Sequence, residues 1–187
     1  MVALTLAVAL AGCAEPPPES GGPGSAGESV AQLESCTGGV VVTGSGAGPI
    51  ALGMPVAELR ATCAGRDTTI SLEGMNEDVY VLPLDSGGSI MAMLDGSGRV
   101  SRLTITGRGP ATPEGVGAGS MVSEAAAAYP DGCLMPGEGR MVLVVPGAGV
   151  SFQTGAPVGV RGTSPTVLPD STTIAAVYVH GEEAGCP

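Results

Sequence analysis

Residues 50–63 read IALGMPVAELRATC, and 66 residues later residues 116–129 read VGAGSMVSEAAAAY. The two stretches share identical residues at four aligned positions, which in the first stretch are Gly53, Val56, Glu58 and Ala61. In both, apolar residues recur at i, i+3 and i+7, the spacing of one helix face. A glutamate falls in the first turn of each, where the helix dipole favours a carboxylate. The sequence therefore predicts a duplicated unit whose copies both open with a short amphipathic helix.

Alternating or apolar segments follow each predicted helix and indicate antiparallel strands. The expected strands cover residues 79–84, 89–94 and 99–106 in the first copy, and 141–145, 150–153 and 172–180 in the second, with an extra strand at 39–43. The predicted fold class is α+β. It consists of two tandem helix-plus-three-stranded antiparallel meander repeats, residues 36–112 and 113–187, whose sheets lie side by side or are continuous, with the helices on one face.

The phrase IALGMPVAEL at residues 50–59, followed by a meander whose last strand opens with Gly98-Arg99-Val100, resembles the SmpA/OmlA (BamE-like) lipoproteins. In tandem it also resembles the two-repeat fold of the β-lactamase inhibitory protein. The resemblance covers most of residues 50–180, and Pro55 departs from the Ser or Thr that the family often has there. It implies binding to other proteins, as a scaffold of outer-membrane assembly or as an inhibitor of a secreted hydrolase.

Cys13 ends the sequence LAGC behind an uncharged apolar run from Val2 to Ala11, which looks like a bacterial lipobox. The run has the length of a signal-peptide core and about half that of a membrane-spanning helix. No Lys or Arg precedes it, so either the true start lies upstream or the α-amino group alone supplies the positive charge. We expect a signal peptide at residues 1–12, a lipid on Cys13, and a Pro/Gly/Ser-rich tether at residues 13–35.

This reading places the protein in the cell envelope, anchored to a membrane through its lipid. Ala14, rather than Asp, follows the lipid cysteine, which favours the outer membrane, facing the periplasm, in a host with two membranes. An oxidising compartment would pair the other four cysteines as disulfides. Three pairings are possible; we prefer the one that closes each half internally, Cys36 with Cys63 and Cys133 with Cys186.

Charge and composition argue against several classes of partner. The chain has seven arginines, no lysine and 18 acidic residues, giving a formal net charge of −11. Such a charge repels phosphate backbones, and one Phe, three Tyr and no Trp offer few platforms for stacking bases. We therefore expect no nucleic-acid partner. Without a CxxC motif or a Cys/His cluster, we expect no metal and no cofactor.

The sequence patterns that could indicate a catalytic or ligand-binding site all have structural interpretations. No G-x-S-x-G elbow occurs, and the single histidine, His180, is interpreted as a surface or half-buried residue. Residues 44–48, GSGAG, lack the ending of a phosphate-binding loop and are interpreted as a plain loop, while residues 95–98 are expected to form a hairpin turn. Four carboxylates are interpreted as a solvated acidic face and six methionines as core: Glu73, Glu77, Asp78, Asp85; Met75, Met91, Met93, Met121, Met135, Met141.

Together these observations favour a noncatalytic protein-binding or assembly module of the cell envelope, whose partner is another envelope or secreted protein. The expected contact surface is the sheet face opposite the helices, which carries Arg102, Thr104 and Thr106, because only one face of a sheet is needed for the core. Two alternatives stay open: an inhibitor that presents the loop Thr154 to Asp170 to a secreted hydrolase, and a lipoprotein that binds a small ligand or a metal.

The lipidation hypothesis is tested by Cys13→Ser, because serine lacks the sulfur that carries the lipid. We expect the variant to leave the membrane fraction and its mass to lack the acyl groups of the native protein. An unchanged membrane fraction and an unchanged set of modifications would contradict the hypothesis.

Overall fold

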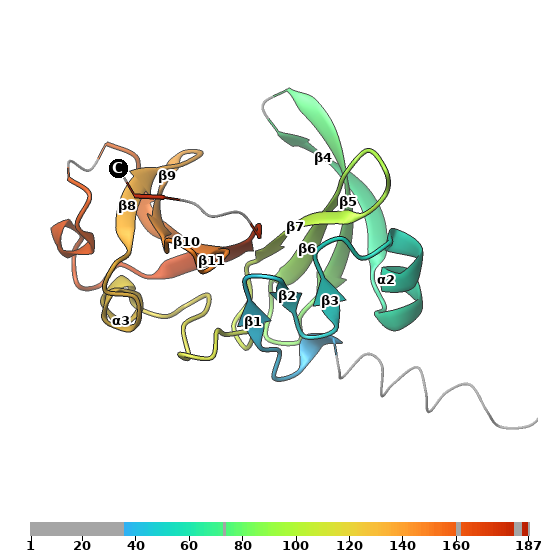
Figure 1. Cartoon of the computed structure of the whole chain (residues 1–187), viewed down its shortest axis with the longest axis horizontal. Coiled ribbons are helices and arrows are strands. Elements are labelled where there is room, and N and C mark those ends of the chain that lie inside the picture. The colour runs from blue at the N-terminus through green and yellow to red at the C-terminus, as the bar shows by residue number, and fades with distance from the viewer. Residues whose placement is uncertain (1–35, 73, 160–161, 182–184, 187) are drawn as a thin grey trace, which may run out of the picture.

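The main sheet holds eight antiparallel strands in the order β4-β5-β6-β7-β11-β10-β9-β8 (Figure 1). The computed structural model describes residues 36–72, 74–159, 162–181 and 185–186. Strands of the main sheet are β4 (Arg66–Leu72), β5 (Met75–Pro83), β6 (Ser89–Leu94), β7 (Val100–Ile105), β8 (Cys133–Pro136), β9 (Arg140–Val144), β10 (Val150–Pro157) and β11 (Ile174–Val179).

A second, three-stranded sheet precedes the helix at residues 56–62. It contains β1 (Val42–Thr43), β2 (Gly46–Ala47) and β3 (Ile50–Ala51), and the remaining elements are the helices α2 (Val56–Thr62) and α3 (Val122–Ala128) and the 3₁₀ turn η1 (Pro165–Val167). No helix among the described residues is long and apolar enough to span a membrane. Cys13 and the predicted signal peptide and tether lie outside the described residues.

The predicted α+β fold class is wrong. The described chain is mostly β-structure, with two α-helices of seven residues each, and four strands rather than three follow each helix. The prediction missed β4 because its sequence, RDTTISL, is largely polar and exposed at the edge of the sheet. It missed β8 because that strand has only four residues and ends in a proline. β7 pairs with β11, so all eight strands belong to one sheet.

Both helices form where the sequence predicts them, with Leu59, Val122 and Ala125 buried. The chain pairs with a strand of the main sheet just before each helix. The amide of Gly53 donates to the carbonyl of Val100 at 2.7 Å, and that of Gly119 donates to the carbonyl of Ile174 at 2.8 Å. Both glycines have positive φ, 79° and 92°, which a residue with a side chain rarely adopts. This geometry accounts for the glycine that both stretches share.

One hydrophobic cluster unites the two sheets and the helices. It contains Leu59 of α2, Val122 of α3 and Ile50 of β3, together with one face of the main sheet. Phe152 of β10, the one phenylalanine of the chain, is fully buried in it, with its ring centroid 5.5 Å from that of Tyr129. The side chains that the main sheet contributes include Leu82, Ile90, Leu103, Ile105, Leu143, Phe152, Val177 and Val179.

The preferred disulfide pairing is confirmed. Cys36 is bonded to Cys63 at the end of α2, and Cys133 at the start of β8 is bonded to Cys186 near the C-terminus. The bonds close loops of 27 and 53 residues. By the chain-entropy estimate such loops stabilise the fold by about 3.5 and about 4 kcal/mol.

Phe152 provides a test of this core. Replacing it with alanine should lower the free energy of unfolding by about 3–5 kcal/mol, because the cavity left in a closely packed cluster collapses only in part. Val158→Ala is the control, since Val158 is 45% exposed and its truncation should change stability by less than about 0.5 kcal/mol. Urea unfolding measures both. Equal small losses would show that Phe152 is not at the centre of the core.

Candidate functional site

The second face of the main sheet carries the side chains that alternate with the core residues. Around its centre, Thr104 of β7 lies opposite Met91 of β6 on one side and Tyr178 of β11 on the other. We name this surface the open face. Its defining residues are Val79, Val81, Met91, Met93, Arg102, Thr104 and Tyr178.

All three residues predicted for a contact surface belong to this side of the sheet, because they alternate with buried Leu103 and Ile105. Their surroundings differ more than the sequence suggests. Arg102 is half-buried, Thr104 is only 8% exposed, and Thr106 is exposed. The Thr106 hydroxyl donates to the carbonyl of Ser89 at 3.3 Å and accepts from its amide at 3.1 Å, which fastens β7 to β6.

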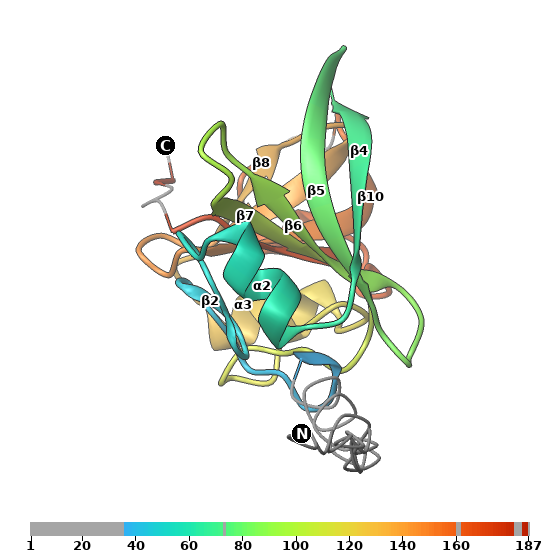
Figure 2. The ribbon, with the colours of Figure 1, turned by 90° about the vertical axis from the view of Figure 1, so that its right-hand side faces the viewer.

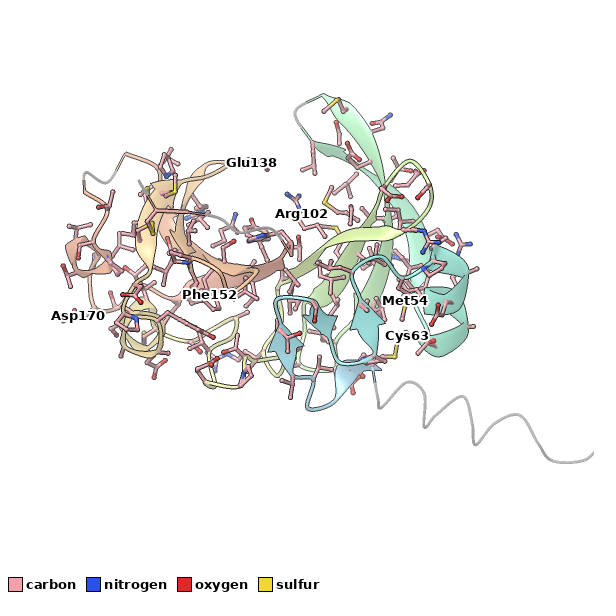
Figure 3. All side chains as sticks on the ribbon, viewed as in Figure 1. Met54, Cys63, Arg102, Glu138, Phe152 and Asp170 are labelled. Carbon is pink, nitrogen blue, oxygen red and sulfur yellow. A yellow bond between two sulfur atoms is a disulfide. The ribbon has the colours of Figure 1, made fainter. Side chains whose placement is uncertain are left out.

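Arg102 lies at the middle of the open face (Figure 3), and no carboxylate of the described residues forms an ion pair with it. Its Nε–H donates to the Met93 sulfur at 3.1 Å, and its guanidinium carbon lies 5.8 Å from the centre of the Tyr178 ring. Within the described part of the chain the one ion pair joins Arg60 to Asp67. A thioether is a weak acceptor, so most of the five N–H donors of Arg102 lack a strong protein acceptor.

The Thr104 hydroxyl is buried and makes no hydrogen bond to any described residue. It lies on the same face as Arg102, beneath the side chains of the neighbouring strands. A buried hydroxyl without a partner destabilises a protein by about 1–3 kcal/mol. Such groups are uncommon in folded proteins, and this one lies beside an arginine that lacks a strong acceptor.

Tyr178 completes the centre of the open face. Burial raises the pKa of its phenol above the ordinary value, Arg102 acts in the opposite direction, and Glu138, between β8 and β9, raises the pKa further. The phenol is therefore protonated at neutral pH. Tyr178 thus presents an uncharged ring and a hydroxyl next to the guanidinium.

A cavity of about 520 Å³ lies at one end of the open face. Val81 forms part of its wall and is paired in the sheet with Arg66 on one side and Met91 on the other. Arg66 is its one charged lining residue. The other lining residues are Ala64, Gly65, Pro83, Gly88 and Ser89.

Residues 75–78 of β5 pair with residues 69–72 of β4 and not with β6, so this part of the two strands forms a projecting ribbon (Figure 2). By the alternation of strands, Ile70 and Leu72 share the side of the open face with Met75 and Glu77, their partners across the ribbon. The other side of the ribbon is polar. Met75 is 61% exposed. The apolar strip of the open face thus continues along the ribbon.

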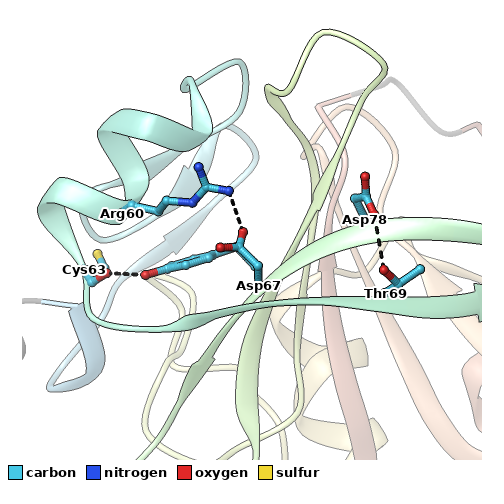
Figure 4. A network of polar contacts seen from close by, with 6 residues as sticks. Arg60, Cys63, Asp67, Thr69 and Asp78 are labelled. Carbon is cyan, nitrogen blue, oxygen red and sulfur yellow. Dashed lines mark hydrogen bonds and ion pairs between the residues drawn. The ribbon is translucent and has the colours of Figure 1, made fainter.

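Of the carboxylates that the sequence singles out, Asp78 and Asp85 are exposed and Glu77 is half-buried. Asp78 accepts a hydrogen bond from the Thr69 hydroxyl at 3.3 Å (Figure 4). No group of His, Cys, Asp or Glu among the described residues has the arrangement of a metal site. Glu73 lies outside the described residues.

Asp95 forms the expected hairpin turn between β6 and β7. Its carboxylate accepts from the amides of Ser97 at 2.8 Å and Arg99 at 3.0 Å. The Arg99 amide, followed by the Ser97 hydroxyl and amide, holds the pKa of this carboxyl below its ordinary value. The charged carboxylate is therefore committed to the turn.

Other motifs also acquire structural roles. The glycine run at residues 44–48 is not a plain loop, since it contains β2, and a Cβ on Gly44 would meet the Ala148 carbonyl oxygen at 2.1 Å. His180 is half-buried and follows β11, where its amide donates to the Gly149 carbonyl at 3.1 Å. Of the methionines expected in the core, Met141 is buried, whereas Met75 and Met121 are exposed. Met91 and Met93 are half-buried on the open face, and Met135 is also half-buried.

Tyr129 and Glu114 form the one hydrogen bond between a tyrosine and a carboxylate among the described residues. The Tyr129 hydroxyl donates to the Glu114 carboxylate, and burial, with this hydrogen bond, raises the pKa of Tyr129 to about 12. The same hydrogen bond lowers the pKa of Glu114. Both groups keep their proton states near neutral pH, so the pair suits a fixed contact rather than proton transfer.

Comparison with known proteins identifies a fold but no family. No protein-family model and no curated protein matches the chain. The crystal structure of the uncharacterized protein yfeY from Escherichia coli is similar, with a TM-score of 0.55 and 16% sequence identity over 75% of this chain and 99% of that one. At this identity the likeness concerns the fold alone.

The unpartnered hydroxyl of Thr104 leads to an unusual prediction, that removing it increases stability. Thr104→Val removes the buried hydroxyl but keeps the shape, so it should raise the free energy of unfolding by about 1 kcal/mol. Thr154→Val is the matched control: Thr154 is fully buried, but its hydroxyl donates to the Met141 carbonyl at 2.9 Å, and its loss should destabilise the chain. Denaturant unfolding measures the stability of both variants. A loss of stability in Thr104→Val would contradict the assignment of an unpartnered hydroxyl.

Proposed function

We propose that the protein is a lipid-anchored module of the cell envelope that binds another envelope or secreted protein without catalysing a reaction, and that the open face is its contact surface. One observation carries the proposal. Half-buried Met91, Met93 and Tyr178 surround Arg102, which has no carboxylate partner in the described chain. Methionine, tyrosine and arginine are the residue types enriched where proteins bind one another.

The chemistry of these side chains suits a protein partner. Methionine adapts its shape to what covers it, and tyrosine and arginine supply large contact areas together with directed hydrogen bonds. The projecting ribbon of β4 and β5 extends this surface with Ile70, Leu72 and Met75. The size of the surface supports a protein rather than a small molecule as the main ligand.

A lipid anchor on Cys13 would keep the open face near the membrane. Two or more acyl chains hold a protein stably on a bilayer. For a partner in the same membrane, this confinement raises the effective concentration of the two proteins, so a weak interaction would suffice.

The inhibitor alternative has less support. Within the expected inhibitory loop, Thr154, Ala156 and Leu168 are buried. A small-ligand function is favoured by one observation, the cavity of about 520 Å³ beside Arg66, whose size is typical of ligand sites.

Site-directed photo-crosslinking in the expressing cells tests the proposal. Gln153 of β10 is half-buried and lies opposite Ala176, which is two residues from Tyr178 and therefore on the same side of the sheet as the open face. A benzophenone amino acid at Gln153 should give covalent adducts with one defined envelope or secreted protein. The same group at Ala57, exposed on α2, is the control and should give none. Absence of adducts from Gln153, or identical adducts from both positions, would refute the open face as the contact surface.

A further inference from the structure

The unused hydrogen-bonding groups at the centre of the open face indicate which chemistry the partner brings. Arg102 offers a planar set of N–H donors, of which the described chain occupies one with a sulfur atom. A guanidinium is best satisfied by a carboxylate or phosphate that accepts two parallel hydrogen bonds. The structure therefore lacks an anionic acceptor at this position.

Thr104 points to the same acceptor by independent evidence. Its hydroxyl is buried without a partner and lies on the same strand face as Arg102, two residues along β7. A hydroxyl on the same strand face as an arginine can donate to the anion that the arginine binds. The unbound chain thus loses stability through a buried hydroxyl whose hydrogen bond a ligand would supply. Functional sites often lower stability in this way.

The size of the surrounding surface indicates that a polypeptide carries this anion. The apolar strip runs from the ribbon of β4 and β5 across β6 and β7 to Tyr178 on β11, which is four strand spacings or about 19 Å. Apolar side chains on both sides of Arg102 would contact the residues that flank the anion. A bare phosphate or a small carboxylate would leave most of this strip uncovered.

The negative charge of the chain further limits which partner segments can bind. The chain has a formal net charge of −11, and Glu138 lies close enough to influence Tyr178. A run of acidic residues would be repelled by this field. A single carboxylate between apolar residues avoids most of that repulsion and still pairs with Arg102.

We propose that the open face receives a segment of the partner protein in which one Asp or Glu is flanked by apolar residues. Its carboxylate accepts hydrogen bonds from the guanidinium of Arg102, which Figure 3 labels, and from the Thr104 hydroxyl. Its apolar neighbours pack on Met91, Met93 and Val81. This assignment rests on the protein-binding function proposed above and names the chemistry of the partner. The charge of Arg102 and the planar arrangement of its N–H groups both contribute to binding the carboxylate, so lysine would replace it only in part.

The test measures adduct yield from the benzophenone at Gln153 in four backgrounds. Arg102→Gln should lower the yield about tenfold or more, because it removes the charge and the hydrogen bonds that hold the carboxylate. Arg102→Lys should lower it less. Thr104→Val should lower it severalfold even though the chain is expected to be more stable, which separates loss of binding from loss of folding. Arg108→Gln, an exposed arginine between β7 and α3, should leave the yield unchanged.

Mass spectrometry of the adduct completes the test. The crosslinked segment should contain an Asp or Glu beside apolar residues, and its replacement by Asn or Gln should abolish the effect of Arg102→Gln. Undiminished adducts in Arg102→Gln would overturn this assignment and leave the protein-binding function intact. A wild-type chain that gives no protein adduct, yet retains sodium dodecanoate in an Arg102-dependent manner, would overturn both.

Discussion

The pairing of β7 with β11 is the contact on which the rest of the structure depends. It joins the four strands that follow α2 to the four that follow α3, and it consists of three residue pairs. Two of them, Leu103 with Val179 and Ile105 with Val177, consist of fully buried side chains. Without this pairing each half would end in an unprotected strand edge and a divided core.

The same pairing creates the open face. Its middle pair places Tyr178 beside Thr104, on the side away from the core, and Arg102 then reaches the Tyr178 ring. Each half alone would hold only part of this group, since Arg102 and Thr104 come from one half and Tyr178 from the other. The pairing of β7 with β11 therefore places core residues on one face of the sheet and the candidate site on the other. The Thr104 hydroxyl, which has no hydrogen-bond partner among the described residues, belongs to the middle pair.

Local sequence patterns predict part of this structure well. The helix face that contains Leu59 follows from its spacing, and the disulfides follow from an even number of cysteines after Cys13 is set aside. The alternation of Arg102 and Thr104 with Leu103 places them on the open face without any structure. These features depend on neighbours within a few residues or on simple counting.

Features that depend on distant partners could not be predicted in this way. β4 has only Ile70 and Leu72 as apolar residues, because one of its edges and most of its side chains contact solvent, and this is too short a pattern to predict a strand. The pairing of β7 with β11 leaves no periodic signal, since it joins segments far apart in the chain. Thr104 is buried although it lies on the side of the sheet away from the core, where its partners are Met91 of β6 and Tyr178 of β11. Those partners lie far from it in the sequence, so local patterns predict an exposed residue there.

A crystal structure of the chain bound to its crosslinked partner segment would show whether the open face binds an anion in this way. We expect a partner carboxylate with oxygens about 2.7–3.0 Å from the Arg102 guanidinium nitrogens and from the Thr104 hydroxyl, over the junction of β7 and β11. A partner bound elsewhere, or one that covers the open face while Arg102 and Thr104 keep their present surroundings, would contradict this expectation.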